Sequence, residues 1–212
     1  MTAMVLTHLG LGDHIVCNGM MQELAKRHNG VVTFAKEHNV LSVTQMFLDA
    51  PIEVRDVREI NEEVFPVMYM IGYNWRDKNL PFDKDFYRIA NVPFAERWNS
   101  FKAILPSDQF WNPPSGPYVF LHEDPQRDML VDRKRLPLGM SVFEVKKGET
   151  PDIFEYYTMM AMAAEIHVID SAFMFLADSF SELGAKTVVH RYARRLPPDE
   201  IPTLMRIERI LT

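Results

Sequence analysis

The chain has 212 residues, of which 47% are hydrophobic and 25% are charged, and these values exclude a disordered tail, a collagen-like chain and a low-complexity segment. Its 23 Lys and Arg against 29 Asp and Glu give a formal net charge of −6, which argues against broad binding to nucleic acid or anionic membranes. The single cysteine, Cys17, excludes an internal disulfide framework and a multi-cysteine metal site, so we expect a reducing, cytoplasmic setting.

We expect neither a signal peptide nor a membrane-spanning segment. The apolar N-terminus has no basic lead and meets Gly10, Gly12 and Asp13 too early for a signal peptide. The longest later apolar stretch, 156–164, is far below the roughly 20 residues that a spanning helix needs.

The first half alternates between strand and helix patterns. Buried-type runs predict strands, and spaced apolar positions predict helices. We expect strands at 3–7, 31–35, 52–57 and 64–71, and helices at 14–27 and from Asn39 through Leu48. This short-range alternation indicates parallel βαβ units.

The pattern loosens between Tyr73 and Pro114, where helices are expected at 83–90 and 94–104. The cluster Asn112-Pro113-Pro114-Ser115-Gly116-Pro117 is the strongest run of helix and strand breakers in the chain. We therefore place a domain boundary near 105–116 and expect domains at 1–105 and 106–212.

A second strand–helix series follows the boundary. We expect strands at 118–122, 140–145, 165–169 and 186–190, and helices at 153–163 and 172–180. The spacing of Ile201, Leu204, Ile207 and Leu211 predicts a terminal helix that begins after Asp199. The predicted fold class is α/β, with two small Rossmann-like βαβ domains.

The first candidate ligand site is the turn Gly10-Leu11-Gly12-Asp13-His14, between a strand and a helix. Glycines permit a sharp turn, and the N–H groups at a helix start can bind an anion. The turn is not a full dinucleotide fingerprint, because Ile15 stands where the third glycine would be. A plain tight turn remains an alternative, and helix capping is an alternative role for Asp13.

Three more segments place polar groups after predicted strands of the second half. In Asp170-Ser171-Ala172-Phe173, the Ser171 hydroxyl is suited either to holding a phosphate or to capping the next helix. His122 is a candidate acid, base or donor, and Arg127 suits a bidentate phosphate contact, although both also fit a solvated loop. Arg191 begins a basic stretch that is either an anion site or a solvated face.

The seven histidines are scattered, without the spacing of metal ligands, and no Gly-x-Ser-x-Gly nucleophile motif occurs. Cys17 lies on an apolar stretch of the first predicted helix, and His8 and His167 lie in predicted strands. We interpret all three as core residues.

Two of these segments together resemble one family. Gly10-Leu11-Gly12-Asp13-His14 with its helix resembles the opening of GT-B glycosyltransferases of the heptosyltransferase, family 9-like type, where a Gly-Asp pair ends the first strand. Residues 167–178 resemble that family's Asp-Thr/Ser-Gly-x-x-His-Leu-Ala segment, with Ala172 at the glycine and Phe175 at the histidine. The resemblance implies two domains facing each other across a cleft, with the acceptor side first and the nucleotide-sugar donor side second.

The resemblance also implies roles for individual residues. Asp13 would be the general base that takes the proton of an acceptor hydroxyl, and His14 would be a second catalytic residue. Gly10 and Gly12 would form the turn and bind substrate or donor there. The donor diphosphate would be bound by Asp170, Ser171, Ala172 and Phe173, with His122, Arg127 and Arg191 nearby.

The implied reaction transfers a sugar from a nucleotide-diphosphate sugar to a hydroxyl acceptor, such as a glycan, without metal or cofactor. Two alternatives remain open from the sequence. One is a nucleotide-sugar epimerase of the same fold, and the other is a degenerate glycosyltransferase that acts as a non-catalytic binding module.

Overall fold

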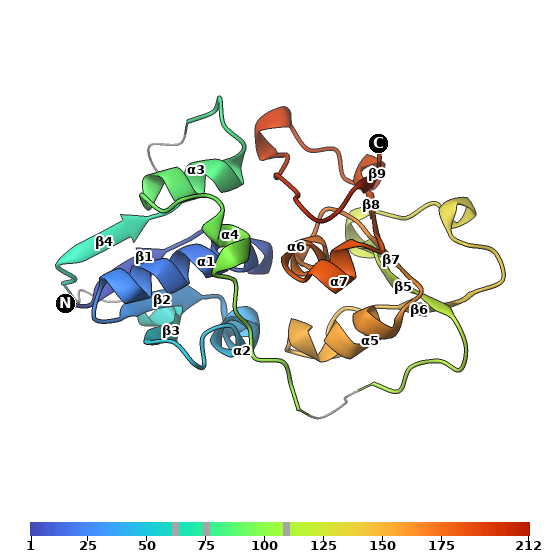
Figure 1. Ribbon diagram of the computed structural model, residues 1–212, viewed down its shortest axis with the longest axis horizontal. Coiled ribbons are helices and arrows are strands. Elements are labelled where there is room, and N and C mark those ends of the chain that lie inside the picture. The colour runs from blue at the N-terminus through green and yellow to red at the C-terminus, as the bar shows by residue number, and fades with distance from the viewer. Residues whose placement is uncertain (61–63, 74–76, 108–110) are drawn as a thin grey trace. The chain divides into compact units, whose positions relative to one another are not determined.

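The computed structural model describes residues 1–60, 64–73, 77–107 and 111–212 (Figure 1). The chain divides into two compact units, each with a parallel sheet and helices. The first unit contains Met1–Ile104 and Pro197–Thr203, and the second contains Leu105–Leu196 and Leu204–Thr212. The chain therefore passes between the units three times.

The first unit contains a four-stranded sheet in the order β3-β2-β1-β4, and all of its strand pairs are parallel. All five residues of β2 are buried, as expected for a central strand covered on both faces. The order reverses between β1 and β4, which makes their carboxyl ends the switch point of this sheet. The strands are β1 (Ala3–Leu6), β2 (Val31–Ala35), β3 (Ile52–Asp56) and β4 (Val67–Met70).

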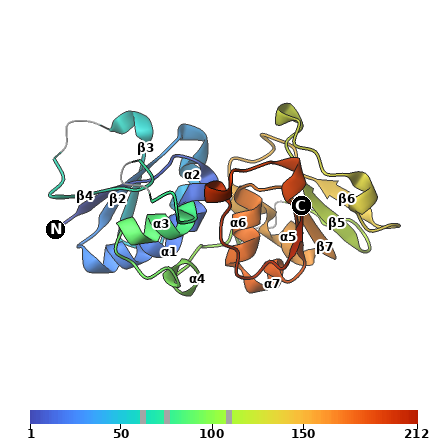
Figure 2. The ribbon, with the colours of Figure 1, turned by 90° about the horizontal axis from the view of Figure 1, so that it is seen from above.

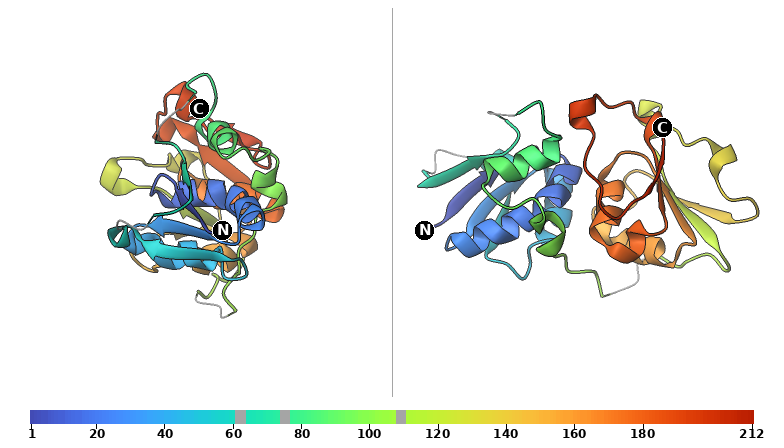
Figure 3. Two further views of the ribbon diagram at one scale, coloured as in Figure 1. Left: turned by 90° about the vertical axis from the view of Figure 1, so that its left-hand side faces the viewer. Right: turned by 45° about the horizontal axis from the view of Figure 1, so that its top comes forward.

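Helix α1 packs closely against α4 at Gly19. A Cβ there would lie 1.9 Å from the carbonyl oxygen of Glu96 in α4, so only glycine permits this contact. The buried Asn18 side chain bonds the carbonyl and the N–H of Lys102, at 2.7 and 2.9 Å. Figure 3 shows α3 and α4 lying along α1. The helices are α1 (Leu11–Arg27), α2 (Val40–Gln45), α3 (Phe82–Ile89) and α4 (Glu96–Asn99).

The second unit contains a five-stranded parallel sheet in the order β6-β5-β7-β8-β9. Its order reverses between β5 and β7, so the carboxyl ends of these two strands form the switch point. The strands are β5 (Tyr118–His122), β6 (Ser141–Glu144), β7 (Glu165–Val168), β8 (Thr187–His190) and β9 (Arg209–Leu211).

The two faces of the second sheet are covered differently. Figures 1 and 2 both show the helices of this unit on one face, where Phe120 of β5 contacts Phe173 of α6. On the other face, Val119 and Leu121 of β5 pack with Val131 and Leu136 of the long β5–β6 loop. Side chains alternate along a strand, so His122 shares the helix-covered face with Phe120. The helices are α5 (Tyr157–Met162), α6 (Ala172–Ser179) and α7 (Ser181–Gly184).

The prediction of two parallel βαβ sheets is confirmed, but the helix predicted for 94–104 is wrong after Asn99. Asn18 binds the backbone of Lys102, and the Gln45 side chain donates to the carbonyl of Ile104 at 2.6 Å. These side chains from α1 and α2 satisfy backbone groups that a helix would otherwise pair internally.

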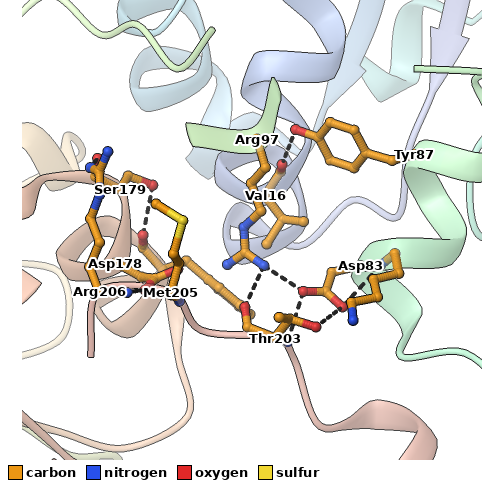
Figure 4. A network of polar contacts seen from close by, with 11 residues as sticks. Val16, Asp83, Tyr87, Arg97, Asp178, Ser179, Thr203, Met205 and Arg206 are labelled. Carbon is orange, nitrogen blue, oxygen red and sulfur yellow. Dashed lines mark hydrogen bonds and ion pairs between the residues drawn. The ribbon is translucent and has the colours of Figure 1, made fainter. Parts of the chain in front are cut away.

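The predicted terminal helix after Asp199 is also wrong. The structure has a short 3-10 turn at Pro198–Glu200, then irregular chain, then the strand β9, which pairs with β8. Within the first unit, Asp83 accepts from the N–H of Thr203 at 2.8 Å, and Arg97 bonds both Asp83 and the Thr203 carbonyl (Figure 4). Asp178 in turn accepts from the N–H groups of Met205 and Arg206, at 2.9 and 2.8 Å. These carboxylates bind backbone N–H groups that a helix would pair internally.

In the part of the chain that the structure describes, no helix has the length and apolar character that crossing a bilayer requires. Cys17 and His167 are buried, as predicted, whereas His8 is only half-buried. The imidazole of His8 lies 2.7 Å from the carbonyl oxygen of Gly72, which follows β4.

Candidate functional site

The turn after β1 leads directly into α1, as the glycine pattern predicts. Gly10 is the N-cap, and Asp13 and His14 both bond its carbonyl through their N–H groups, at 3.1 and 3.2 Å. Gly12 lies within the first turn of the helix. A Cβ on Gly10 would lie 2.6 Å from Oδ2 of Asp13, so the Asp13 carboxylate lies directly over the glycine. Glycine at this position therefore leaves room for the carboxylate.

His14 is directed into the protein, where its ring is 2% exposed. One nitrogen, Nδ1, lies 3.4 Å from the hydroxyl of Thr7, and Nε2 has no hydrogen-bond partner among the described residues. Burial lowers the pKa of His14 from 6.5 to about 4, so the ring is neutral at pH 7.

The end of β1 lies beside the end of β4, and this pairing brings Tyr73 close to Asp13. The hydroxyl of Tyr73 donates to the carbonyl of Thr7 at 3.0 Å, and its ring packs edge-on against His8. Burial raises the pKa of Tyr73, and the nearby charge of Asp13 raises it further. Tyr73 and Asp13 are 60 residues apart in the sequence, so no local sequence pattern indicates that they lie close together.

The second unit brings His122 and Ser171 together at the switch point of its sheet. His122 ends β5, and Ser171 follows β7, the next strand in space. The Ser171 hydroxyl lies 3.1 Å from Nδ1 of His122. Burial lowers the pKa of His122 to about 4, while the charge of Asp124 opposes this shift. A neutral imidazole and a hydroxyl therefore face each other where α/β sheets usually bind ligands.

Ser171 is the N-cap of α6, but its side chain makes no capping hydrogen bond there. Its carbonyl accepts from the N–H groups of Met174 and Phe175, at 3.1 and 3.3 Å. The first N–H groups of a helix, here those of Ala172 and Phe173, have no partner within the helix and carry the positive end of its dipole. The Phe173 ring packs against His122, with centroids 4.5 Å apart. The predicted residues 170–173 and His122 thus form one cluster.

Asp170 and Arg191 form an ion pair beside this cluster. Nε of Arg191 lies 3.3 Å from Oδ1 of Asp170, and Arg194 donates to the Asp170 carbonyl at 2.7 Å. Asp170 Oδ2 and one terminal nitrogen of Arg191, Nη2, are buried without a hydrogen-bond partner among the described residues. Burial raises the pKa of Asp170, and Arg191 opposes that shift. Arg191 therefore retains a donor for a ligand.

Arg127 lies apart from these contacts, on the exposed 3-10 turn Pro125–Arg127. Its guanidinium is 67% exposed and forms an ion pair with Asp124 at 3.4 Å. The role predicted for it in diphosphate binding stays a prediction.

Among the described residues, no three His, Cys, Asp or Glu side chains are grouped as metal ligands. His122, Asp170–Phe173 and Arg191 form the candidate site of the second unit, and this cluster is named here the α6 edge.

No model of a protein family matches the chain, and no curated protein matches it in sequence. Its fold is similar to that of two solved structures. One is the bacterial iron-containing dodecameric glycosyltransferase TibC from enterotoxigenic E. coli H10407, with a TM-score of 0.57 at 12% identity. The other is the dodecameric iron-containing heptosyltransferase TibC in complex with ADP-D-β-D-heptose, with a TM-score of 0.58 at 11% identity.

Both alignments cover 89% of this chain but 57% of the TibC chain, so this chain spans little more than half of the TibC length. The comparisons show that this chain shares an α/β fold with part of TibC.

Proposed function

We propose that the chain is a GT-B-type glycosyltransferase that moves a sugar from a nucleotide-diphosphate sugar to a hydroxyl acceptor without a metal ion. The observation that carries the proposal is the hydrogen bond between Ser171 and His122, at the sheet's switch point and at the N-terminus of α6. The TibC complex with ADP-D-β-D-heptose supports a nucleotide sugar as the donor class.

The α6 edge suits a departing nucleoside diphosphate. Negative charge develops on the diphosphate as the sugar leaves, and the dipole of α6 and the guanidinium of Arg191 both favour that charge. If the Ser171 hydroxyl donates to Nδ1 of His122, the neutral ring keeps its proton on Nε2. His122 then donates a hydrogen bond to an anion without carrying a charge itself.

In the first unit, Asp13 is the proposed general base for the acceptor hydroxyl. Its carboxylate is half-buried at the first turn of α1, near Tyr73. Proton transfer to a positioned carboxylate typically contributes about 10²–10⁴-fold to a rate. The catalytic role expected for His14 stays a prediction, and its ring is buried against Thr7 and neutral at pH 7.

Calorimetric titration with UDP, GDP, ADP, CMP and NAD, without added metal, tests the donor class. We expect one nucleoside diphosphate to bind. Ser171→Ala and Arg191→Ala should each raise its dissociation constant about tenfold, which corresponds to about 1.4 kcal/mol of binding free energy. Ser181→Ala is the matched control. Ser181 also begins a helix, α7, and among the described residues its hydroxyl bonds only the exposed Glu182. Selective binding of NAD would contradict the proposal.

Replacing Asp13 with Asn separates the enzymes from a binding module. If the chain is a transferase, the Asp13→Asn variant loses turnover. It keeps its affinity for the donor, because the proposed donor site is in the second unit and Asp13 is in the first. An epimerase interconverts the nucleotide sugar with no acceptor present. A degenerate binding module binds the nucleotide sugar and shows no turnover even in the wild type, an outcome that would overturn the proposed catalysis.

A further inference from the structure

Four side chains form a continuous hydrogen-bonded row through the second unit. Glu165 and His167 come from β7, His190 ends β8, and Tyr192 lies in the 3-10 turn Arg191–Ala193. Glu165 Oε2 lies 2.9 Å from His167 Nε2, His167 Nδ1 lies 2.8 Å from His190 Nε2, and His190 Nδ1 lies 2.9 Å from the Tyr192 hydroxyl. Both histidines are fully buried. We name these residues the histidine row.

The partners at the two ends determine where each proton lies. An ionised Glu165 only accepts, so His167 carries its proton on Nε2 and accepts at Nδ1. His190 must then donate from Nε2 and accept at Nδ1 from the Tyr192 hydroxyl. The Tyr192 oxygen in turn accepts from the N–H of Asp132 at 2.8 Å. Every group is satisfied when both rings are neutral with the proton on Nε2.

The surrounding charges are compatible with two neutral rings. Burial lowers the pKa of both histidines, that of His190 to about 4. Arg209 of β9 pairs with Glu165 at 3.0 Å and so keeps that carboxylate ionised. On the other side, the Arg135 guanidinium lies over the Tyr192 ring, 4.9 Å from its centroid, near Asp132.

Tyr192 directly follows Arg191 in the same turn, and it is the point where the histidine row reaches the α6 edge. The turn is held on one side by the His190 and Asp132 contacts of Tyr192, and on the other by the Arg191 pair with Asp170. A three-residue 3-10 turn closed by one backbone bond, from the N–H of Arg194 to the Arg191 carbonyl, has little rigidity of its own.

We propose that His190 and Tyr192 are positioning residues for anion binding, and that the histidine row fixes the turn that aims Arg191 at a diphosphate. This inference rests on the proposed function of the α6 edge. The affinity for the diphosphate then depends on the Tyr192 hydroxyl, which does not contact the ligand and acts only through Arg191.

The test is a double-mutant cycle on the full chain, with inorganic diphosphate as the probe in calorimetry. Tyr192→Phe removes only the hydroxyl. In a chain that keeps Arg191, we expect this change to raise the dissociation constant of the diphosphate about tenfold. In the Arg191→Met background, we expect the same change to have almost no effect, because the two residues act as a unit. Tyr157→Phe, whose hydroxyl bonds the exposed Glu182, is the control and leaves the affinity unchanged.

Nitrogen-15 NMR of the imidazoles reads the histidine row without any ligand. We expect both His167 and His190 to carry the proton on Nε2 at pH 7, and we expect Tyr192→Phe to shift the Nδ1 resonance of His190. A proton on Nδ1 of either ring, or equal effects of Tyr192→Phe in both backgrounds of the cycle, would overturn the positioning role. If the wild type instead binds no diphosphate while both rings carry the proton on Nε2, the proposed function and the positioning role both fail. The assigned tautomers of the histidine row then remain correct.

Discussion

The hydroxyl of Tyr87 in α3 donates a hydrogen bond to the backbone carbonyl of Val16 in α1, at 3.0 Å (Figure 4). The same oxygen accepts from the N–H of Met20 at 3.1 Å. Val16 and Met20 are four residues apart, so they would normally bond each other within the helix. The Tyr87 hydroxyl thus links the Val16 carbonyl to the Met20 N–H in α1, the helix that begins at the Gly10 turn.

Replacing Tyr87 with Phe should destabilise the first unit. The substitution removes a hydrogen-bond partner from a buried carbonyl and a buried N–H, which costs about 1–3 kcal/mol. Urea unfolding measures the loss, with Tyr69→Phe as the control, because the Tyr69 hydroxyl bonds the half-buried His28. If both variants lose the same stability, α1 closes its own hydrogen bond and the bridge is dispensable.

The buried ion pair between Asp83 and Arg97 should matter far more than an exposed one. Asp83 is 0% and Arg97 2% exposed, and both hold the backbone of Thr203. Removing one member leaves the other charge buried, so Asp83→Ala should cost about 3–5 kcal/mol in unfolding free energy. The exposed pair of Arg55 and Glu53 is the comparison, where Glu53→Gln should cost below about 1 kcal/mol.

Hydrogen exchange gives a second reading of the Asp83 variant. The N–H of Thr203 should exchange faster in Asp83→Ala than in the wild type, because it loses its acceptor. Unchanged protection of that amide would show that other contacts hold the segment.

Several boundaries of the fold followed from local patterns, and the exceptions have a common cause. Strands β1 to β8 and helix α1 were predictable because their apolar residues repeat with the period of the element that buries them, whereas β9 was not. The apolar spacing of Ile201, Leu204 and Ile207 also fits a helix, yet this segment is irregular. Its N–H groups bond Asp83 and Asp178, which lie far away in the sequence. No local pattern records such distant acceptors.

The candidate site was predictable to a similar degree. Strand-to-turn patterns located His122, Ser171 and Arg191 because polar residues after buried strands gather at one edge of a parallel sheet. Capping was the open alternative for Ser171, and the structure shows its hydroxyl on His122 instead. Tyr73 was missed because its proximity to Asp13 depends on the pairing of β4 with β1.

The folded chain should lose stability as the pH falls from 6.5 towards 4. Burial lowers the pKa of His14, His122 and His190 to about 4 each, whereas the unfolded histidines protonate below 6.5. Over this range the unfolded state binds more protons, so each histidine contributes a loss of up to about 1.4 kcal/mol per pH unit.

Unfolding curves of His14→Phe at several pH values isolate one of these contributions. The variant should show a shallower fall in stability between pH 6.5 and 4, because it lacks a buried group that titrates. His38→Gln, at an exposed position, controls for the loss of a histidine. Parallel curves for the wild type and His14→Phe would contradict the assignment of a neutral, buried His14.

Gly10→Ala should impair catalysis while the fold persists. Gly10 has φ −76° and ψ 140°, which alanine adopts without strain, but its Cβ would lie 2.6 Å from Asp13 Oδ2. The carboxylate must move, and we expect turnover to fall by about tenfold or more with donor affinity unchanged. Steady-state kinetics with a nucleotide sugar measure this, and unchanged turnover would argue against Asp13 as the base.

NMR titration of the nitrogen-15-labelled chain, with the nucleoside diphosphate that binds best, shows whether the α6 edge binds the diphosphate. We expect the largest amide shifts on Ser171, Ala172 and Phe173, together with shifts of the His122 imidazole and the Arg191 side chain. Shifts concentrated instead at the Gly10–His14 turn, or spread without a centre, would contradict binding at the α6 edge.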